Sequence, residues 1–224
     1  MPLYEDNHLI IVNKPAGYLV QGDKTGDLPL NEIVKEYIRI TYKKPGDAYL
    51  GTIHRLDRPA SGVLIFAKTS KALIRMNKLF AENKIEKIYW MLSEELAPES
   101  EAKLTHYLIK DRNKNTSRAF VKEKKGAKKS TLKYSLQKSI NGNQLYVIKL
   151  ETGRPHQIRV QMATIGCPII GDVKYGAPKP LDDSSIALHC RSISFIHPVS
   201  KEKIFVHAPF PHHPVWQNFK TIDE

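Results

Sequence analysis

The spacing of hydrophobic and polar residues predicts several strands in the first third of this 224-residue chain. Residues 8–20 combine apolar runs with Pro15-Ala16-Gly17, which predicts a strand, a turn and a second strand. Residues 62–67, Gly-Val-Leu-Ile-Phe-Ala, form a continuous apolar run, as expected of a strand buried on both faces. Residues 51–61 contain too many polar residues and too much proline for a core element, so we predict a loop there.

Three helices are predicted in other segments of the chain. The first begins near Pro29, and the second is capped by Thr69 or Ser70. The third is predicted over residues 155–164 and is closed by Gly166. The apolar positions at helical spacing in the first two are Leu30, Ile33, Val34, Tyr37, Ile38, Leu73, Met76 and Phe80.

The fold class follows from how these elements alternate. Further β-rich segments are predicted at residues 85–93, 117–121, 131–136, 144–150, 186–197 and 202–207. Strands and helices are mixed without regular βαβ alternation, so we predict an α+β fold. The sequence shows no internal repeat, linker or domain boundary, and we expect residues 1–224 to form a single domain.

Charge and cysteine content narrow the setting in which the protein works. The formal net charge is +12, which favours a polyanionic partner. Residues 110–133 hold ten basic and two acidic residues, so this segment carries +8 of that charge and is a candidate binding face. The acidic N-terminus is unlike a signal peptide, and no apolar run is long enough to span a membrane. Two cysteines form no disulfide framework, so we expect a cytoplasmic protein.

Candidate chemistry is densest in residues 52–62, where Asp57 is surrounded by His54, Arg55, Arg58 and Ser61. A loop mounted on a buried strand suits a catalytic carboxylate. In the simpler structural alternative, Asp57 caps a turn or pairs with a neighbouring arginine on the surface. A hydrolase built from Ser61, His54 and Asp57 is another alternative, but the chain has no Gly-x-Ser-x-Gly elbow.

A second polar cluster lies at residues 151–159, Glu-Thr-Gly-Arg-Pro-His-Gln-Ile-Arg. His156 and Arg159 are three residues apart, so we expect them to share one helix face near a helix N-terminus, where anions are favoured. A desolvated carboxylate needs such a cation to stay ionised. The histidines His207, His212 and His213 have no cysteine or acidic residue at ligand spacing, so we predict no metal site.

Several motifs together resemble the RluA/RsuA-type pseudouridine synthases. His54-Arg55-Leu56-Asp57-Arg58 with Ser61-Gly62 is similar to the family signature. Asn13-Lys14-Pro15-Ala16-Gly17 and Lys87-Ile88-Tyr89 resemble the opening turn and the second motif. Residues 152–159 resemble the third motif, which continues through residues 166–172 and Tyr175-Gly176. Leu188-His189 and His197-Pro198, near the end of the chain, also fit the family pattern. In order, these matches cover roughly residues 4–210.

The resemblance implies an isomerase, an intramolecular transferase that converts a specific uridine of ribosomal or transfer RNA to pseudouridine. It implies a central mixed, mostly antiparallel sheet flanked by helices and loops. It makes Asp57 the catalytic carboxylate, Arg159 its basic partner, and Tyr89 the aromatic residue that packs against the uracil. No cofactor is required, because the detached uracil is itself the group that is re-added.

The resemblance also assigns substrate contacts. Arg55 would fill the space of the flipped nucleotide, an extrusion that costs a few kcal/mol. The other substrate-binding candidates are His54, Arg58, Arg154, His156 and Gln157. The charge of the basic segment at residues 110–133, rather than the resemblance, gives the candidates for binding the RNA backbone, which are Lys124, Lys125, Lys128 and Lys129.

The sequence departs from the family pattern in a few places. Ala60 stands where threonine is frequent, and Gln161 stands where histidine is frequent. No room for an S4 RNA-binding domain precedes Tyr4, so we expect the catalytic domain itself to grip RNA, as a monomer without an obligatory protein partner. The rival hypothesis is a non-catalytic RNA-binding protein on the same scaffold, which predicts loss of Asp57, Tyr89 or Arg159, whereas all three are present.

Overall fold

The computed structural model describes residues 2–222 and divides the chain into two compact units. The first unit comprises the residues up to Ile85 together with Arg191–Pro209. The second comprises Glu86–Cys190 and the C-terminal segment from Phe210. Both units combine strands with helices or helical turns, so the α+β prediction is confirmed. The expectation of a single domain over residues 1–224 stays a prediction.

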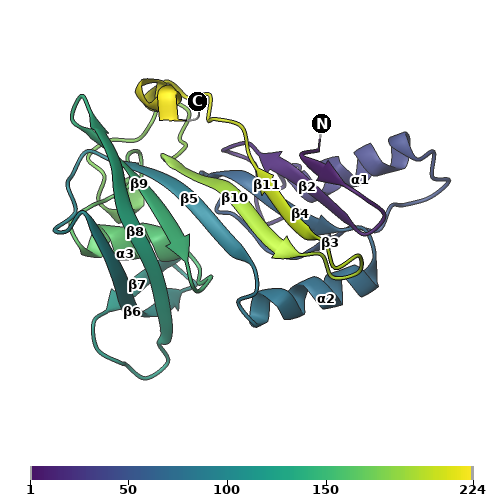
Figure 1. Cartoon of the computed structure of the whole chain (residues 1–224), viewed down its shortest axis with the longest axis horizontal. Helices are drawn as coiled ribbons and strands as arrows, with labels where there is room; N and C mark the ends of the chain where they lie inside the picture. Colours follow the sequence, from purple (N-terminus) through teal and green to yellow (C-terminus); the bar gives the residue numbers. More distant parts are fainter. Residues whose placement is uncertain (1, 223–224) are drawn as a thin grey trace. The chain divides into compact units, whose positions relative to one another are not determined.

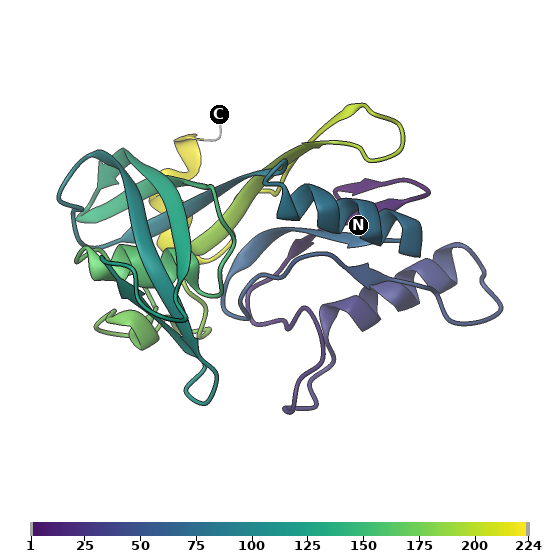
Figure 2. The same cartoon turned by 90° about the horizontal axis from the view of Figure 1, so that it is seen from below.

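Antiparallel strands organise the first unit. The strands are β1 (Tyr4–Glu5), β2 (Leu9–Lys14), β3 (Gly51–Thr52), β4 (Ser61–Ala67), β10 (Leu188–Ile196, in this unit from Arg191) and β11 (Lys203–His207). β4 pairs with β2 and β3, β2 also pairs with β1, and β10 pairs with β11 in a ribbon visible in Figure 2. Every β4 residue from Gly62 to Ala67 is buried, which confirms the predicted buried strand. The loop predicted over residues 51–61 is shorter than expected, because β3 includes its first two residues and β4 begins at its last one.

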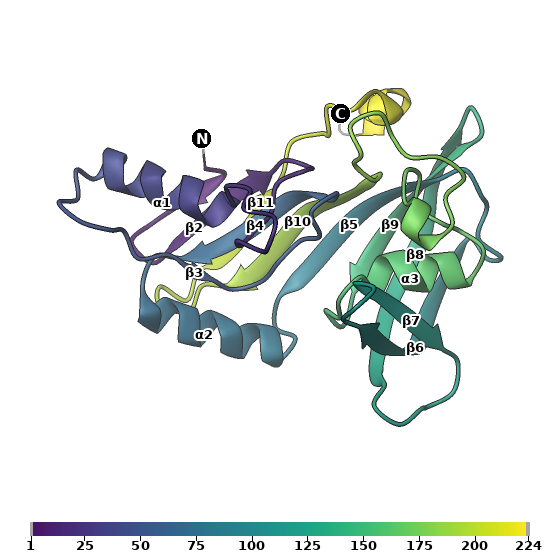
Figure 3. The ribbon, with the colours of Figure 1, turned by 180° about the vertical axis from the view of Figure 1, so that it is seen from behind.

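Helix α1 (Leu30–Thr41) follows Pro29 as predicted and lies behind β2 in Figure 1 and in front of it in Figure 3. Its N–H groups at Leu30 and Asn31 donate to the carbonyls of Leu19 and Val20 at 2.8 and 3.2 Å. These bonds explain why the second strand predicted within residues 8–20 is wrong. The carbonyls that such a strand would pair with a neighbour are used instead to cap a helix.

Helix α2 (Ser70–Ala81) is capped by Thr69, whose Oγ1 accepts from the Ala72 N–H at 3.1 Å. Met76 is fully buried, while Leu73 and Phe80 are half-buried. The helix runs alongside β3 and β4, as Figure 1 shows. It therefore covers the strand that follows the Asp57 loop.

The second unit is an antiparallel sheet with a helix on one face. Its strands, in spatial order, are β5 (Glu86–Ser93), β9 (Asn143–Leu150), β8 (Lys128–Ile140), β6 (Glu101–Asp111) and β7 (Thr116–Phe120). The sequence did not predict β6, where the buried His106 interrupts the apolar alternation of Ala102, Leu104 and Leu108. The His106 ring faces Gln161 of α3 (Gln157–Thr164), and the distance from His106 Nδ1 to Gln161 Nε2 is 3.0 Å.

Helix α3 lies in front of β8 and β9 in Figure 3 and behind them in Figure 1. It begins two residues later than predicted, because His156 has a φ of 55° and is left-handed. The helix ends as predicted, with Gly166 at a φ of +79° and its N–H donating to the Ala163 carbonyl at 3.0 Å. Short 3-10 helices η1 (Val173–Tyr175) and η2 (Pro214–Ile222) complete the unit. Over residues 2–222, every helix is too short or too polar to span a membrane.

Candidate active site

Asp57 lies half-buried in the loop that joins β3 to β4. Its backbone carbonyl accepts from the Ala60 N–H at 3.0 Å, which closes a tight turn over residues 57–60. Leu56 points into the core with 8% of its surface exposed, whereas Arg55 is exposed. The buried Leu56 side chain thus anchors the loop, while the charged side chains of Arg55 and Arg58 are exposed.

Lys14, at the end of β2, stabilises this turn through hydrogen bonds to backbone carbonyls. Its side chain is fully buried, and Nζ donates to the carbonyls of Pro15, Arg58 and Ala60 at 2.8, 3.1 and 2.7 Å. Burial lowers the pKa of Lys14 to about 7, while the charge of Asp57 acts in the opposite direction. In the sequence, Lys14 stands out only as part of a motif that resembles the family's opening turn. The structure shows what that motif does physically, because it fastens the backbone on either side of the turn.

Arg58 completes the brace from the other side. Its carbonyl accepts from the Gly17 N–H at 2.8 Å, and its Nε donates to the Gly17 carbonyl at 2.9 Å. Its Nη2 pairs with Asp27 at 2.7 Å. Gly17 has a φ of +86°, which favours glycine at this reciprocal contact. The Arg58 guanidinium is therefore bonded within the protein, and its role in substrate binding stays a prediction.

His54 fastens the start of the same loop. Its Nε2 accepts from the Ile65 N–H at 3.0 Å, and its ring stacks on Phe80 with centroids 4.9 Å apart. An acceptor Nε2 means that the neutral ring carries its hydrogen on Nδ1. The lone pair that a serine hydroxyl would need is thus already in use, which argues against the hydrolase alternative. Substrate binding by His54 stays a prediction.

In the second unit, Arg159 forms a buried bidentate pair with Asp172. Nε donates to Oδ2 at 2.7 Å and Nη2 to Oδ1 at 2.8 Å, with 6% and 1% of the two side chains exposed. Asp172 orders the turn over residues 171–176, because its backbone carbonyl accepts from the Tyr175 N–H at 2.9 Å. The carboxylate has the additional task of holding Arg159, which the sequence did not reveal.

Tyr175 joins His156 to Arg159. The Arg159 guanidinium carbon lies 5.0 Å from the Tyr175 ring centroid, and the Tyr175 hydroxyl is 2.8 Å from His156 Nδ1. The prediction that His156 and Arg159 share a helix face is wrong, because His156 precedes the helix. Both side chains nevertheless contact Tyr175. Lys110 Nζ lies 3.1 Å from His156 Nε2, and the Ser117 N–H donates to the Tyr175 hydroxyl at 2.7 Å. An ammonium can only donate, so His156 carries its hydrogen on Nδ1.

Tyr89 is a buried residue of β5, with 7% of its surface exposed. Cross-strand pairs run from Tyr89 on β5 across the sheet to β6. The successive neighbours are Ile148 on β9, Tyr134 on β8 and Ala102 on β6. Ala102 shares its side of β6 with His106, the residue that faces α3, because side chains alternate along a strand. Tyr89 is therefore on the face of the second unit's sheet that α3 covers, and Trp90 is on the opposite face.

Gln157, Arg154 and the lysines complete the predicted set. Gln157 is 3% exposed; its Oε1 accepts from Thr152 Oγ1 and the Arg154 N–H at 2.8 and 3.0 Å, and its Nε2 donates to the Thr131 carbonyl at 3.1 Å. Its amide thus shapes the turn before α3. Arg154 is exposed, and substrate binding by it, His156 and Gln157 stays a prediction. The backbone candidates, exposed on the β7–β8 loop and the start of β8, are Lys124, Lys125, Lys128 and Lys129.

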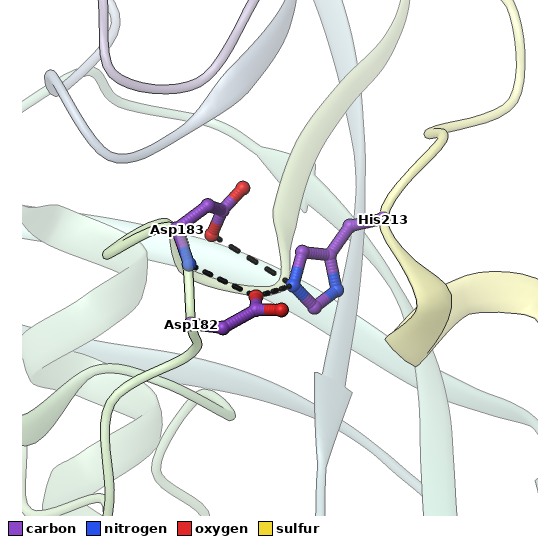
Figure 4. A group of neighbouring side chains, drawn as sticks. All are labelled: Asp182, Asp183 and His213. Carbon is purple, nitrogen blue, oxygen red and sulfur yellow. Dashed lines mark hydrogen bonds and ion pairs between the residues drawn. The ribbon is translucent and has the colours of Figure 1, made fainter.

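A separate cluster joins Asp182, Asp183 and His213 (Figure 4), although no acidic residue lies at ligand spacing from this histidine in the sequence. His213 Nε2 lies 2.7 Å from Asp182 and 3.7 Å from Asp183, and its Nδ1 accepts from the Val215 N–H at 3.1 Å. The imidazole therefore donates through Nε2, and this hydrogen bond lowers the pKa of Asp182. With 81% and 50% of the two aspartate side chains exposed, the cluster is a surface contact that links the loop between η1 and β10 to the start of η2.

Comparison with known proteins agrees with these features. The family model described as RNA pseudouridylate synthase matches residues 8–164. The "Ribosomal large subunit pseudouridine synthase C" of Buchnera aphidicola subsp. Acyrthosiphon pisum is 37% identical over 214 residues, which cover 92% of this chain and 66% of that protein. The protein of the same name from the subspecies Baizongia pistaciae is 34% identical, and the match covers 99% of this chain and 69% of that one. This chain thus spans about two thirds of the length of these relatives.

A solved structure, "Human RNA Pseudouridylate Synthase Domain Containing 4", matches with a TM-score of 0.78 at 20% identity and covers 94% of this chain and 88% of that one, which supports the fold. The chain belongs to the RNA pseudouridylate synthase family.

Proposed function

We propose that this protein isomerises a specific uridine in RNA to pseudouridine and that Asp57 is its catalytic carboxylate. The observation that carries the proposal is the bracing of the Asp57 turn from three sides. Lys14 binds its carbonyls, Arg58 is tied to Gly17, and His54 is tied to β4. A carboxylate that must meet one atom of a substrate gains from such fixed geometry.

The chemistry needs no additional reactant. The N1–C1′ bond of the uridine breaks, the uracil turns, C5 bonds to C1′, and the proton lost from C5 is balanced by one gained at N1. Asp57 acts as an anion, either attacking C1′, adding to the base, or removing a proton from the sugar. The target nucleotide must first leave its stack, which costs a few kcal/mol.

Tyr89 and Arg159 are the other proposed catalytic residues. Tyr89 packs against the uracil and serves in proton abstraction from C5, while Arg159 supplies positive charge. The bidentate bond to Asp172 supports this role for Arg159, because it fixes the guanidinium in one orientation. Arg55, exposed two residues before Asp57, is proposed to take the place of the flipped nucleotide.

Ribosomal RNA is the proposed substrate, since relatives are named for the large ribosomal subunit; transfer RNA is the alternative. The exposed Lys124, Lys125, Lys128 and Lys129 are proposed to bind its backbone. We further propose that the protein acts in the cytoplasm as a monomer, without an obligatory protein partner.

The deciding experiment compares pseudouridine maps, obtained by carbodiimide-based sequencing, from cells with the protein, without it, and with Asp57→Ala. We expect a site that is lost in the last two strains and restored by the wild-type gene. An unchanged map together with retained RNA binding would favour a non-catalytic RNA-binding protein.

A further inference from the structure

The sheet of the second unit has two faces of different character. α3 and the two residues before it cover one of them, because Gln161 meets His106, Lys110 meets His156, and the Ser117 hydroxyl donates to the Pro155 carbonyl at 2.8 Å. Since side chains alternate along a strand, residues one position away from these lie on the other face. That face is turned towards the viewer in Figure 1, where α3 is behind the strands.

The second face is covered at its β5 end, whereas at its β7 end no described helix of this unit lies on it. At the β5 end, Trp90 meets Phe210 of the C-terminal segment with ring centroids 5.9 Å apart. Over β6, β7 and the start of β8, none of the described helices of this unit lies on this face. This helix-free part holds an aromatic pair, Tyr107 on β6 directly opposite Phe120 on β7, and both rings are half-buried.

Basic side chains surround that pair. Lys129 on β8 is the neighbour of Tyr107 across the strand pair, and Arg118 lies two residues before Phe120 on β7. The side chains of Lys129 and Arg118 are therefore on the same face of the sheet as the two rings. Lys124 Nζ lies 4.5 Å from the centroid of the Phe120 ring. No ion pair among the described residues involves Arg118, Lys124 or Lys129, and all three are exposed. Residues 118–129 contain six basic residues and one acidic residue, a formal charge of +5.

The positive charge around Tyr107 and Phe120 is less balanced by acidic residues than the positive charge on the rest of the face. Further along β6 and β8, Lys103 lies opposite Lys133, and Glu151 approaches both, at 2.7 and 4.0 Å. Lys149, opposite Lys133, is paired with Glu86. Aromatic rings and unpaired cations therefore coincide around Tyr107 and Phe120.

We infer that this face, defined by Tyr107, Phe120, Arg118, Lys124 and Lys129, binds a single-stranded segment of RNA. The inference rests on the proposed action on RNA and adds a docking surface to it. The two rings offer stacking surfaces for unpaired bases, and the cations lie where the adjoining phosphates would pass. Lys124 now covers Phe120, but an exposed cation–π contact is weaker than base stacking, so a base can displace this ammonium towards phosphate.

The test measures binding of a fluorescein-labelled oligouridylate of about 10 nucleotides, a length within the usual site size of such surfaces. Tyr107→Leu and Phe120→Leu keep apolar bulk but remove the ring faces, and each is expected to raise Kd roughly tenfold. Tyr107→Phe keeps a ring and is expected to bind within about twofold of wild type, since stacking uses the ring face. Phe205→Leu is the matched control, because this phenylalanine is exposed on β11, in the first unit.

Further measurements separate this inference from the proposed function. The Leu variants should bind a duplex RNA of the same length as tightly as wild type does, because paired bases cannot stack on a protein ring. With the cellular target RNA they should show raised KM with unchanged kcat. An active enzyme whose Leu variants bind the oligonucleotide as wild type does overturns the docking surface and leaves the isomerase intact. A wild-type protein that binds the oligonucleotide through these rings but forms no pseudouridine overturns the isomerase instead.

Should a Leu variant lose its native circular dichroism, Arg118→Gln combined with Lys129→Gln replaces it. This pair lies on the exposed surface, and it is expected to lower the salt dependence of binding by about 1.4 in the log–log slope. An unchanged slope contradicts the inference.

Discussion

The guanidinium of Arg159 is gripped by Asp172 through two parallel hydrogen bonds of 2.7 and 2.8 Å, both within the second unit. Asp172 is 1% exposed and Arg159 is 5% exposed, so neither charge can turn to water if the other is removed. The pair thus contributes both to the stability of the unit and to the orientation of a proposed catalytic residue.

Asp172→Asn is therefore expected to reduce both stability and turnover. Removing one partner of a buried ion pair leaves an uncompensated charge and costs about 3 kcal/mol. Thermal and urea unfolding should show this loss, and kcat should fall by at least about tenfold, as a misoriented guanidinium implies. Glu94→Gln, a change at an exposed carboxylate of the same unit, should leave both quantities at wild-type values. A stable and fully active Asp172→Asn protein would show that Arg159 needs no such support.

Asp57→Ala is expected to abolish pseudouridine formation and to leave RNA binding nearly unchanged. The carboxylate is proposed to act on the flipped nucleotide, while binding draws on many contacts. Asp57→Asn keeps the size of the side chain and should be equally inactive, since the reaction needs the anion. Single-turnover assays measure the reaction, and fluorescence anisotropy measures the affinity. Activity in either variant would remove Asp57 from the catalytic role.

Lys14 should make the stability of the protein depend on pH. Its pKa is lowered from 10.5 to about 7 in the folded chain, so between these values the unfolded state binds the additional proton. The free energy of unfolding should therefore rise with pH from about 7 to about 10.5, by up to a few kcal/mol in total. Lys14→Met should lack this rise, while Lys71→Met, at an exposed position of α2, should retain it. The measurement is urea unfolding at a series of pH values.

The same Lys14→Met protein should also turn over more slowly, since the carbonyls of Arg58 and Ala60 lose their common donor. We expect a lower kcat with little change in KM, because the turn that carries Asp57 loosens while the RNA-binding surfaces stay intact. A raised KM at unchanged kcat would instead assign Lys14 to substrate binding.

Neutralising four lysines to glutamine at positions 124, 125, 128 and 129 should weaken RNA binding and reduce its salt dependence. Each lost phosphate contact lowers the log–log slope by about 0.7 to 0.9, so loss of all four contacts lowers it by roughly 3. Titrations at several salt concentrations provide the slope. The matched control neutralises Lys35, Lys71, Lys78 and Lys84, exposed or half-exposed lysines of the first unit. Equal slopes for the two proteins would mean that the basic segment is only a solvated surface.

The sequence by itself determined the elements whose patterns are strong and local. The buried strand at residues 62–67, the helix that Pro29 introduces and the cap at Thr69 depend on near neighbours in the chain. The spacing of polar motifs was also sufficient to indicate the family. The strand β6 escaped prediction because His106 occupies an inward position, and only the contact with Gln161 shows why a polar ring is tolerated there.

The tertiary structure decided how the candidate residues are held. Lys14 and Ala60 are 46 positions apart in the chain, and no periodicity predicts that an ammonium at one will bind the carbonyl of the other. The left-handed backbone at His156 and the pairing of Arg159 with Asp172 depend in the same way on residues that meet only after folding. Local patterns select helices and strands because their hydrogen bonds and burial repeat at a fixed period. The partners that orient a charged side chain have no such period and are set by the packing of the whole unit.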